Sequence, residues 1–318
     1  MAQQEHSQKF ARVLHSREVV ALSFGAMIGW SWVLMTGVWL TAAGTLGTLI
    51  AFAAGGLAIA LIGLTYSELA AAMPKAGGEH VYTHRALGPR WSFVCTWALL
   101  FSYVNVCLFE SVALPKAVVY LFPEIRMGTL WSVLGAEVDI GFTLVGIAGA
   151  LAVTWVNYVG IRTAAFVQTL VTCLILLAGF VLISGAAIHG EAANAEPWLA
   201  SPASGILVVL IMVPAMLVGF DVIPQSAEEI DLPPNRIGRL LVVSVFCAVI
   251  WYVLISAAVA FGIPSTQLGE AEMATADAAS NLWTSGWAGT LLVIGGIGGI
   301  LTSWNAFIVG ASRVMFAG

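Results

Sequence analysis

Long apolar runs separated by short polar segments dominate the chain. Eight stretches are apolar enough over about 20 residues to cross roughly 30 Å of hydrocarbon as helices. They run over 19–40, 46–72, 91–120, 139–158, 164–188, 203–225, 240–262 and 287–312. The segment 73–90 is instead amphipathic and contains Gly77, Gly78 and Pro89, which predicts a short interfacial or re-entrant helix. The pattern therefore predicts an all-α integral membrane protein with eight spans.

Composition agrees with a membrane protein and argues against an enzyme. Of the 318 residues, 60% are hydrophobic and only 9% are charged, whereas soluble domains carry about 25% charged residues. The four cysteines lie in apolar runs without CxxC or Cys/His spacing, so we expect neither a disulfide framework nor a zinc site. The sequence contains no HExxH, GxSxG or Walker-type motif, so we expect no enzyme, no cofactor and no ATP-driven motor in this chain. It has no basic stripe for nucleic acid.

Lysine and arginine are distributed unevenly along the chain. If the N-terminal segment 1–17 is cytoplasmic, ten basic residues fall on that side: Lys9, Arg12, Arg17, Lys75, Arg85, Arg90, Arg162, Arg236, Arg239 and Arg313. Only Lys116 and Arg126 fall on the other side. Because cytoplasmic loops carry an excess of Lys and Arg, we predict a multi-pass protein of the cytoplasmic membrane with its N-terminus inside.

Two of the predicted spans are interrupted at matching places. Gly25 and Gly29 interrupt the first span. Pro214 and Pro224 interrupt the sixth, because each proline removes a helical hydrogen bond. The glycines alone could form a helix-packing face, but the paired breaks favour a transporter of two inverted repeats that binds its substrate near the bilayer midplane. The predicted units are residues 18–188, with spans one to five, and residues 203–318, with spans six to eight.

Several short segments, in order over residues 18–318, resemble one family. They are Gly25-Ala26-Met27-Ile28-Gly29, Tyr66-Ser67-Glu68-Leu69-Ala70, Met73-Pro74-Lys75-Ala76-Gly77-Gly78-Glu79, Asn157-Tyr158-Val159-Gly160, Gly219-Phe220-Asp221 and Ser312-Arg313. Through them the chain resembles the amino acid–polyamine–organocation (APC) transporter superfamily. The resemblance implies two inverted five-helix repeats, alternating access and an amine-bearing substrate such as an amino acid or polyamine. It also implies further helices after the eighth span, so we expect a fragment or a truncated member with an incomplete second repeat.

The resemblance further implies a substrate site at the first break. In amino acid transporters of this family, backbone N–H groups at the break hold the substrate carboxylate, which the half-helix dipole favours. The family's usual Gly-Ser-Gly is Gly29-Trp30-Ser31 here, so Ser31 keeps an N–H group without glycine's freedom at positive φ. The other residues that the resemblance implies for the pocket are Met27, Tyr103, Cys107, Ala215, Val218, Gly219 and Trp304. The Trp304 ring suits an amine cation, although tryptophan is also common at membrane interfaces.

Glu110 is the most distinctive polar residue within a span. An ionisable residue at membrane depth costs about 2.5–3.5 kcal/mol, so it is a functional candidate. Glu110 shares one helical face with Tyr103 and Cys107, and the resemblance turns that face toward the pocket. It is a candidate counter-ion for a substrate amine or a proton carrier. Alternatively, the third span tilts so that Glu110 reaches the outer interface near Lys116.

Four further positions bear on which ion, proton or sodium, is coupled to transport. Asp221 stands where some members of the family have a carboxylate that gates proton-dependent exchange, but it could equally satisfy N–H groups freed by the break. Thr302 and Ser303 resemble sodium-binding hydroxyls of more distant proteins with the same fold, although such hydroxyls commonly pack helix pairs. Some relatives replace sodium with a lysine on the fifth span, and the corresponding residue here is Ile175. We therefore favour proton coupling or exchange, through Glu110 or Asp221, over sodium.

The sequence thus predicts a secondary active transporter. It would move an amino acid or related amine across the cytoplasmic membrane by alternating access, coupled to protons or by exchange. A channel would need polar rings or a filter loop, which the spans lack. The competing interpretation is a non-transporting sensor or an inactive fragment of the same fold.

Overall fold

The computed structural model describes the chain in three stretches, residues 11–133, 135–201 and 203–317. Most of the predicted N-terminal segment 1–17, Lys9 included, lies outside them. Within these stretches, six helices are long and apolar enough to cross a membrane. They are α3 (Thr36–Ala72), α5 (Pro89–Leu121), α6 (Ile140–Val159), α7 (Ile161–His189), α10 (Pro234–Gly262) and α13 (Gly286–Ala317). They correspond to the predicted spans two to five, seven and eight.

The first and sixth predicted spans are each divided into shorter helices. The first consists of α1 (Ser16–Met27) and α2 (Ser31–Leu34), and the sixth of α8 (Ser204–Met216) and α9 (Val222–Gln225). Both spans are therefore broken, at residues 28–30 and 217–221, although Gly25 lies inside α1, Pro214 inside α8 and Pro224 inside α9.

The first and second spans are joined by a kink within α3 instead of by a loop. The kink lies at Gly44, where φ is 75° and ψ is 176°. A Cβ atom at this position would lie 2.7 Å from the backbone nitrogen of Ala200 and 2.9 Å from the carbonyl oxygen of Trp198. Only glycine combines this positive φ with so close a backbone approach.

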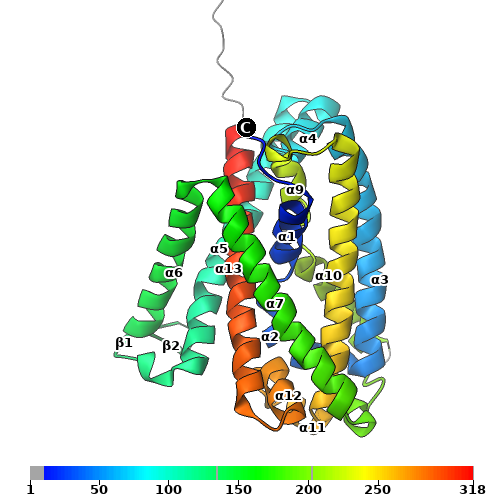
Figure 1. Ribbon diagram of the computed structural model, residues 1–318, viewed down its shortest axis with the longest axis vertical. Helices are drawn as coiled ribbons and strands as arrows, with labels where there is room; N and C mark the ends of the chain where they lie inside the picture. Colours follow the sequence, from blue (N-terminus) through cyan, green and yellow to red (C-terminus); the bar gives the residue numbers. More distant parts are fainter. Residues whose placement is uncertain (1–10, 134, 202, 318) are drawn as a thin grey trace, which may run out of the picture.

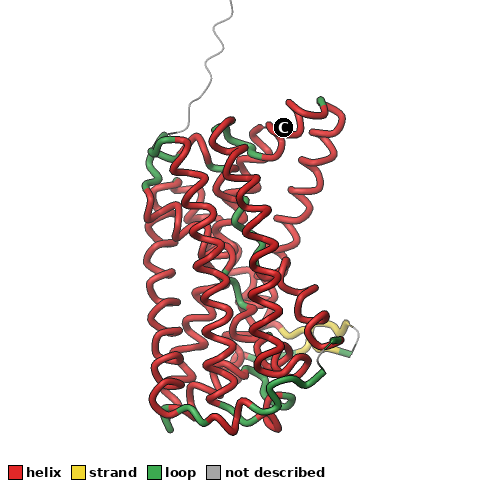
Figure 2. The backbone as a smooth tube through the Cα atoms, turned by 90° about the vertical axis from the view of Figure 1, so that its right-hand side faces the viewer, coloured by secondary structure: helices red, strands yellow, loops and turns green. Residues whose placement is uncertain are grey.

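The long helices run side by side along the molecule. In Figure 1, α3 and α10 pack along each other on one side, while α13 lies centrally and packs along α5 and α7. The hairpin of α5 and α6 stands to the other side, and its lower end carries β1 (Thr129–Val133) and β2 (Ala136–Asp139), an antiparallel pair. The tube view in Figure 2 shows the same strand pair at the edge of the helical body.

The two ends of the bundle carry different short elements. One end holds α11 (Ser265–Leu268) and α12 (Ala274–Leu282), as Figure 1 shows, and the 3₁₀ helices η1 (Pro123–Ile125) and η2 (Ala192–Ala195) lie in loops of that end. The other end holds α4 (Glu79–Leu87), η3 (Ala227–Glu229) and the end of α13. The short helix α4 lies within the predicted amphipathic segment 73–90, whereas the strand pair and α12 were not predicted.

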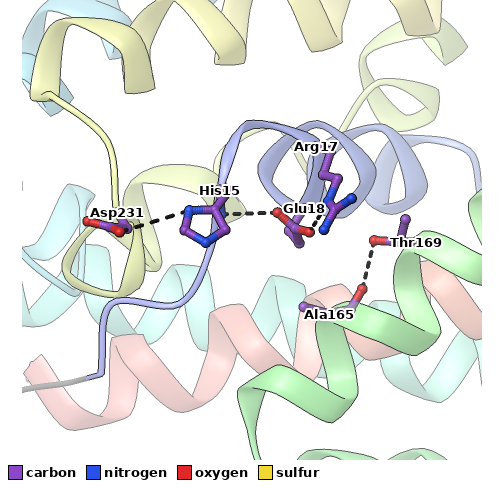
Figure 3. A network of polar contacts seen from close by, with 6 residues as sticks. All are labelled: His15, Arg17, Glu18, Ala165, Thr169 and Asp231. Carbon is purple, nitrogen blue, oxygen red and sulfur yellow. Dashed lines mark hydrogen bonds and ion pairs between the residues drawn. The ribbon is translucent and has the colours of Figure 1, made fainter.

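The chain before α1 is fixed to the segment that follows η3. Leu14 donates its N–H to the carbonyl oxygen of Glu229 at 3.0 Å, and Asp231 donates its N–H to the carbonyl oxygen of Leu14 at 2.8 Å. The Nδ1 atom of His15 lies 3.9 Å from the Asp231 carboxyl, while the backbone N–H of His15 donates to Glu18 at 3.1 Å (Figure 3). The start of the first span is therefore held beside the segment that follows α9.

Large apolar side chains cover the outer faces of α5, α6 and α7. Trp97, Leu151 and Phe180 are each at least 60% exposed. Soluble proteins rarely expose contiguous apolar surface on this scale. In a bilayer these side chains contact lipid, so the outward-facing pattern supports the assignment of these helices as membrane spans.

Candidate substrate site

A cavity of about 730 Å³ lies between the two breaks. Most of the side chains that line it are apolar and come from the first break, α5 and α8. Its polar residues include Ser31, Asn105, Glu110 and Ser303. Ligand pockets of proteins typically have volumes of about 300–1,000 Å³, with a few polar groups among apolar walls. The cavity therefore has the size and lining of a site for a small molecule.

The first break does not require an unusual backbone at Ser31. The chain leaves helical geometry at Ile28, where φ is −100° and ψ is 63°, and returns to it at Trp30, where φ is −81° and ψ is −18°. Ser31 is already inside α2, so the loss of the family's usual glycine costs nothing here. Within the described residues, the N–H groups of Gly29, Trp30 and Ser31 donate no hydrogen bond to another backbone carbonyl.

The Tyr252 side chain of α10 contacts both sides of the first break. Its hydroxyl donates to the carbonyl oxygen of Met27 at 2.9 Å and lies 2.8 Å from the Ser31 hydroxyl. One side chain thus contacts the last residue of α1 and the first residue of α2. The ring is fully buried, stacks on Phe52 with centroids 5.1 Å apart, and meets Trp39 edge to face. The geometry of the break is therefore fixed by side-chain packing from a distant helix.

Glu110 enters the cavity from α5 and is 2% exposed. Its Oε1 atom faces the first break, since a Cβ atom on Gly29 would lie 3.1 Å from it. The Ser303 side chain interacts with the same carboxyl, but the Oε2 atom has no hydrogen-bond partner in the described part of the chain. The structure therefore places Glu110 in the cavity and not beside the exposed Lys116.

Seven of the predicted pocket residues line the cavity: Met27, Gly29, Trp30, Ser31, Glu110, Ala215 and Val218. Four others do not, namely Tyr103, Cys107, Gly219 and Trp304. The Trp304 ring lies against Gly149 of α6, so its side chain packs two helices together. On α5 the cavity is instead lined by an adjacent face that includes Phe101, Asn105 and Phe109. The rotation of α5 about its axis depends on its neighbours, which a sequence pattern does not specify.

Asp221 lies behind the cavity, at the sixth break. Its Oδ1 atom accepts the N–H of Gly219 at 3.0 Å, and its Oδ2 atom accepts the hydroxyl of Tyr103. Gly219 has a φ of 116°, and a Cβ atom there would lie 2.7 Å from that of Ala26. The carboxyl thus satisfies an N–H group freed by the break, which is one of the two roles predicted for it. A gating role for Asp221 remains a prediction.

A neutral amide occupies the space between α1 and α13. Gln168 of α7 donates to the carbonyl oxygen of Ala21 at 3.2 Å and accepts from Asn305 at 2.7 Å. Thr302, one of the two predicted sodium ligands, donates to carbonyl groups of its own helix. Ile175, the residue that corresponds to the lysine of some relatives, packs against Gly298, whereas Gln168 and Thr302 lie against Gly25. Within the described stretches, no group of three or more His, Cys, Asp or Glu side chains could hold a metal ion.

A bundle with two broken helices and a cavity between the breaks has the architecture of a membrane transporter. The family model for amino acid permeases matches residues 18–318, and the chain belongs to this family. It is therefore a membrane protein of a transporter family and not an enzyme, as the resemblance to the APC superfamily implied.

Two relatives in sequence and one solved structure of similar fold can be compared with the chain. The chain is 26% identical over 314 residues to the branched-chain amino acid permease BcaP of Bacillus subtilis, covering 96% of this chain and 66% of that protein. It is 26% identical to human cationic amino acid transporter 4, covering 96% of this chain and 49% of that protein. The fold is similar to that of Mhp1, a nucleobase-cation-symport-1 family transporter, with a TM-score of 0.60, 14% identity, and coverage of 96% of this chain and 67% of Mhp1. The chain thus spans about half to two thirds of the length of these relatives.

Proposed function

We propose that the chain forms the substrate-binding part of a secondary active transporter for an amino acid or related amine. The observation that carries this proposal is the buried Glu110 carboxyl, which lines the cavity and whose Oε2 atom has no hydrogen-bond partner among the described residues. The N–H groups of Gly29, Trp30 and Ser31, which donate to no other backbone carbonyl in the described residues, border the same cavity. A carboxyl for the amine and N–H donors for the carboxylate complement the two charged ends of an amino acid. The names of the relatives support the same substrate class.

Alternating access would follow from the two breaks. We assign residues 18–188 to the first repeat and residues 203–318 to the inverted second repeat, with the N-terminus and α4 on the cytoplasmic side. Rocking of one repeat against the other would then expose the cavity to each side in turn. Proton coupling or exchange is favoured over sodium because the Thr302 hydroxyl bonds to its own helix and the amide of Gln168 fills the adjacent space.

The experiment that tests the proposal is uptake into proteoliposomes. Labelled amino acids and polyamines are supplied with an inward proton gradient, an inward sodium gradient, or neither. Saturable uptake of one amine class that responds to the proton gradient, or exchange with the same amine inside, is the expected result. No uptake and no binding of any amine by the folded protein would favour the non-transporting interpretation.

Glu110→Gln tests the assigned amine contact. The substitution keeps the shape of the side chain and removes its charge. Because a hydrogen bond to a charged group contributes about 1.5–3 kcal/mol, we expect affinity for the amine to fall roughly 10- to 100-fold. Glu124→Gln is the matched control, since Glu124 lies in η1 outside the cavity. Equal affinities of wild type and Glu110→Gln would refute the contact.

A further inference from the structure

A buried polar cluster joins α4 to α9, apart from the substrate cavity. Glu79 is the first residue of α4, and Gln225 is the last residue of α9. The Gln225 side-chain amide donates a hydrogen bond to Oε2 of Glu79. Gln225 is fully buried and Glu79 is 9% exposed. This contact links positions 146 residues apart in the sequence.

Two oxygen atoms of this pair lack a donor. Within the described residues, Oε1 of Glu79 and Oε1 of Gln225 are both buried without a hydrogen-bond partner. Buried polar atoms are nearly always paired, so two such atoms in one contact require an explanation. A carboxylate and an amide oxygen are both acceptors, and neither can satisfy the other. A protonated carboxyl can, because its O–H donates to the amide oxygen while the amide N–H donates to the other carboxyl oxygen.

The surroundings favour the protonated form of Glu79. Asp221 is close enough to act on Glu79 electrostatically, so the two buried carboxyls oppose each other's ionisation. Burial, and then the charge of Asp221, raise the pKa of Glu79 to about 8, against smaller opposing contributions from the Tyr66 and Gln225 side chains. Neither carboxyl belongs to one of the three ion pairs within the described residues, which involve Asp231, Glu18 and Glu229. The other titratable side chains around this cluster are Tyr66 of α3, Tyr82 and His80 of α4, and Cys95 and Tyr103 of α5.

The residues just before and at the start of α4 pack closely against Gln225 of α9. The N–H of Gly77 donates to the carbonyl oxygen of Gln225 at 3.3 Å. Gly78 has a φ of 37°, and a Cβ atom there would lie 3.0 Å from the Gln225 amide nitrogen. The two glycines therefore allow the backbone to approach Gln225 closely. We call this contact of Gly77, Gly78 and Glu79 with Gln225 the α4–α9 junction. Because Glu79 is part of it, a change in the charge of Glu79 acts directly on this junction.

We propose that Glu79 is a proton-binding site whose protonated carboxyl pairs with Gln225 and holds α4 against α9. Loss of the proton to water leaves a second carboxylate beside that of Asp221 and removes the donor for the Gln225 oxygen. The junction then loosens at the end of the bundle predicted to be cytoplasmic. This last consequence rests on the proposed transport function, whereas proton binding by Glu79 does not.

Infrared difference spectroscopy of the reconstituted protein tests proton binding without requiring transport. We expect the carbonyl band of a protonated carboxylic acid to disappear with a midpoint near the pKa of about 8, and to shift in D₂O. Glu79→Gln should lose the Glu79 component of this titrating band and keep any component from the buried Glu110. The variant should also keep the wild-type melting temperature, because its amide can form the same two-armed pair with Gln225. Glu68→Gln is the matched control, since Glu68 is exposed on α3. A titrating band identical in wild type and Glu79→Gln would overturn the assignment.

Asp221→Asn supplies a second test in which Glu79 itself is intact. Removing the neighbouring charge should move the midpoint to lower pH, and an unchanged midpoint would contradict the coupling. In proteoliposomes, Glu79→Gln should bind the amine as wild type does but lose the response of exchange to internal pH. If exchange by Glu79→Gln responded to internal pH as fully as exchange by wild type, the proposed role of the junction in transport would be refuted. Failure of amine binding in wild type would instead count against the proposed function, with the infrared result unaffected.

Discussion

Deleting the Tyr252 hydroxyl should show most directly how much its hydrogen bonds stabilise the first break. Tyr252→Phe deletes only the hydroxyl, which contacts Met27 and Ser31 on the two sides of the break. The ring stays, and with it the stacking on Phe52 and the edge contact with Trp39. The substitution therefore separates hydrogen bonding from packing.

The magnitude follows from two buried hydrogen bonds. Each contributes about 0.5–1.5 kcal/mol net, so we expect Tyr252→Phe to destabilise the folded protein by roughly 1–3 kcal/mol. At about 2–4 °C per kcal/mol, the melting temperature should fall by several degrees. Ser31→Ala removes only one of the two bonds, so its loss should be about half as large.

Thermal unfolding in detergent, followed by tryptophan fluorescence, measures this effect in a double-mutant cycle. Tyr252→Phe and Ser31→Ala share one hydrogen bond, so the double variant should be little less stable than Tyr252→Phe alone. Strict additivity of the two losses would show that the shared bond contributes nothing. A wild-type melting temperature for Tyr252→Phe would refute the view that this hydroxyl stabilises the break.

Two further predictions concern the end of the bundle that holds α4. Arg313→Gln should cost about 3–5 kcal/mol, because Glu229 is only 3% exposed and would lose both of its contacts, at 2.6 and 3.0 Å, with the guanidinium group. Adding Glu229→Gln should recover part of this loss in the same unfolding assay. Burial and the neighbouring His84 lower the pKa of His80 below its ordinary 6.5, so its contribution to stability is present above pH 6.5 and is lost as the pH falls through the lowered value. Melting temperatures measured across this range should therefore depend less on pH in His80→Gln than in wild type.

The sequence was sufficient to predict the spans and the breaks. Each depends on local chemistry: an apolar run of about 20 residues must form a helix in lipid, and glycine and proline weaken such a helix near their own positions. The break at Gly29 and the break that follows Pro214 were therefore predicted without any knowledge of their neighbours, the second to within a few residues. The kink at Gly44 was not, because it depends on the backbone of residues 197–200, which approaches too closely for a Cβ atom.

The candidate site was predicted only in part. Glu110 was recognised because an ionisable residue in lipid is costly wherever it lies. Tyr103 was assigned to the cavity from the helical face that it shares with Glu110, and Trp304 from the family resemblance, but neither lines the cavity. Gln225 and Tyr252 carried no comparable signal, since a single uncharged polar side chain is common both near a break and within an apolar helix. Their roles arise from contacts across 146 and 225 residues. The sequence by itself determined which segments cross the membrane and where they break, because those properties are local. Only the tertiary structure decided which side chains meet at the breaks, because the rotation and packing of each helix depend on all of its neighbours.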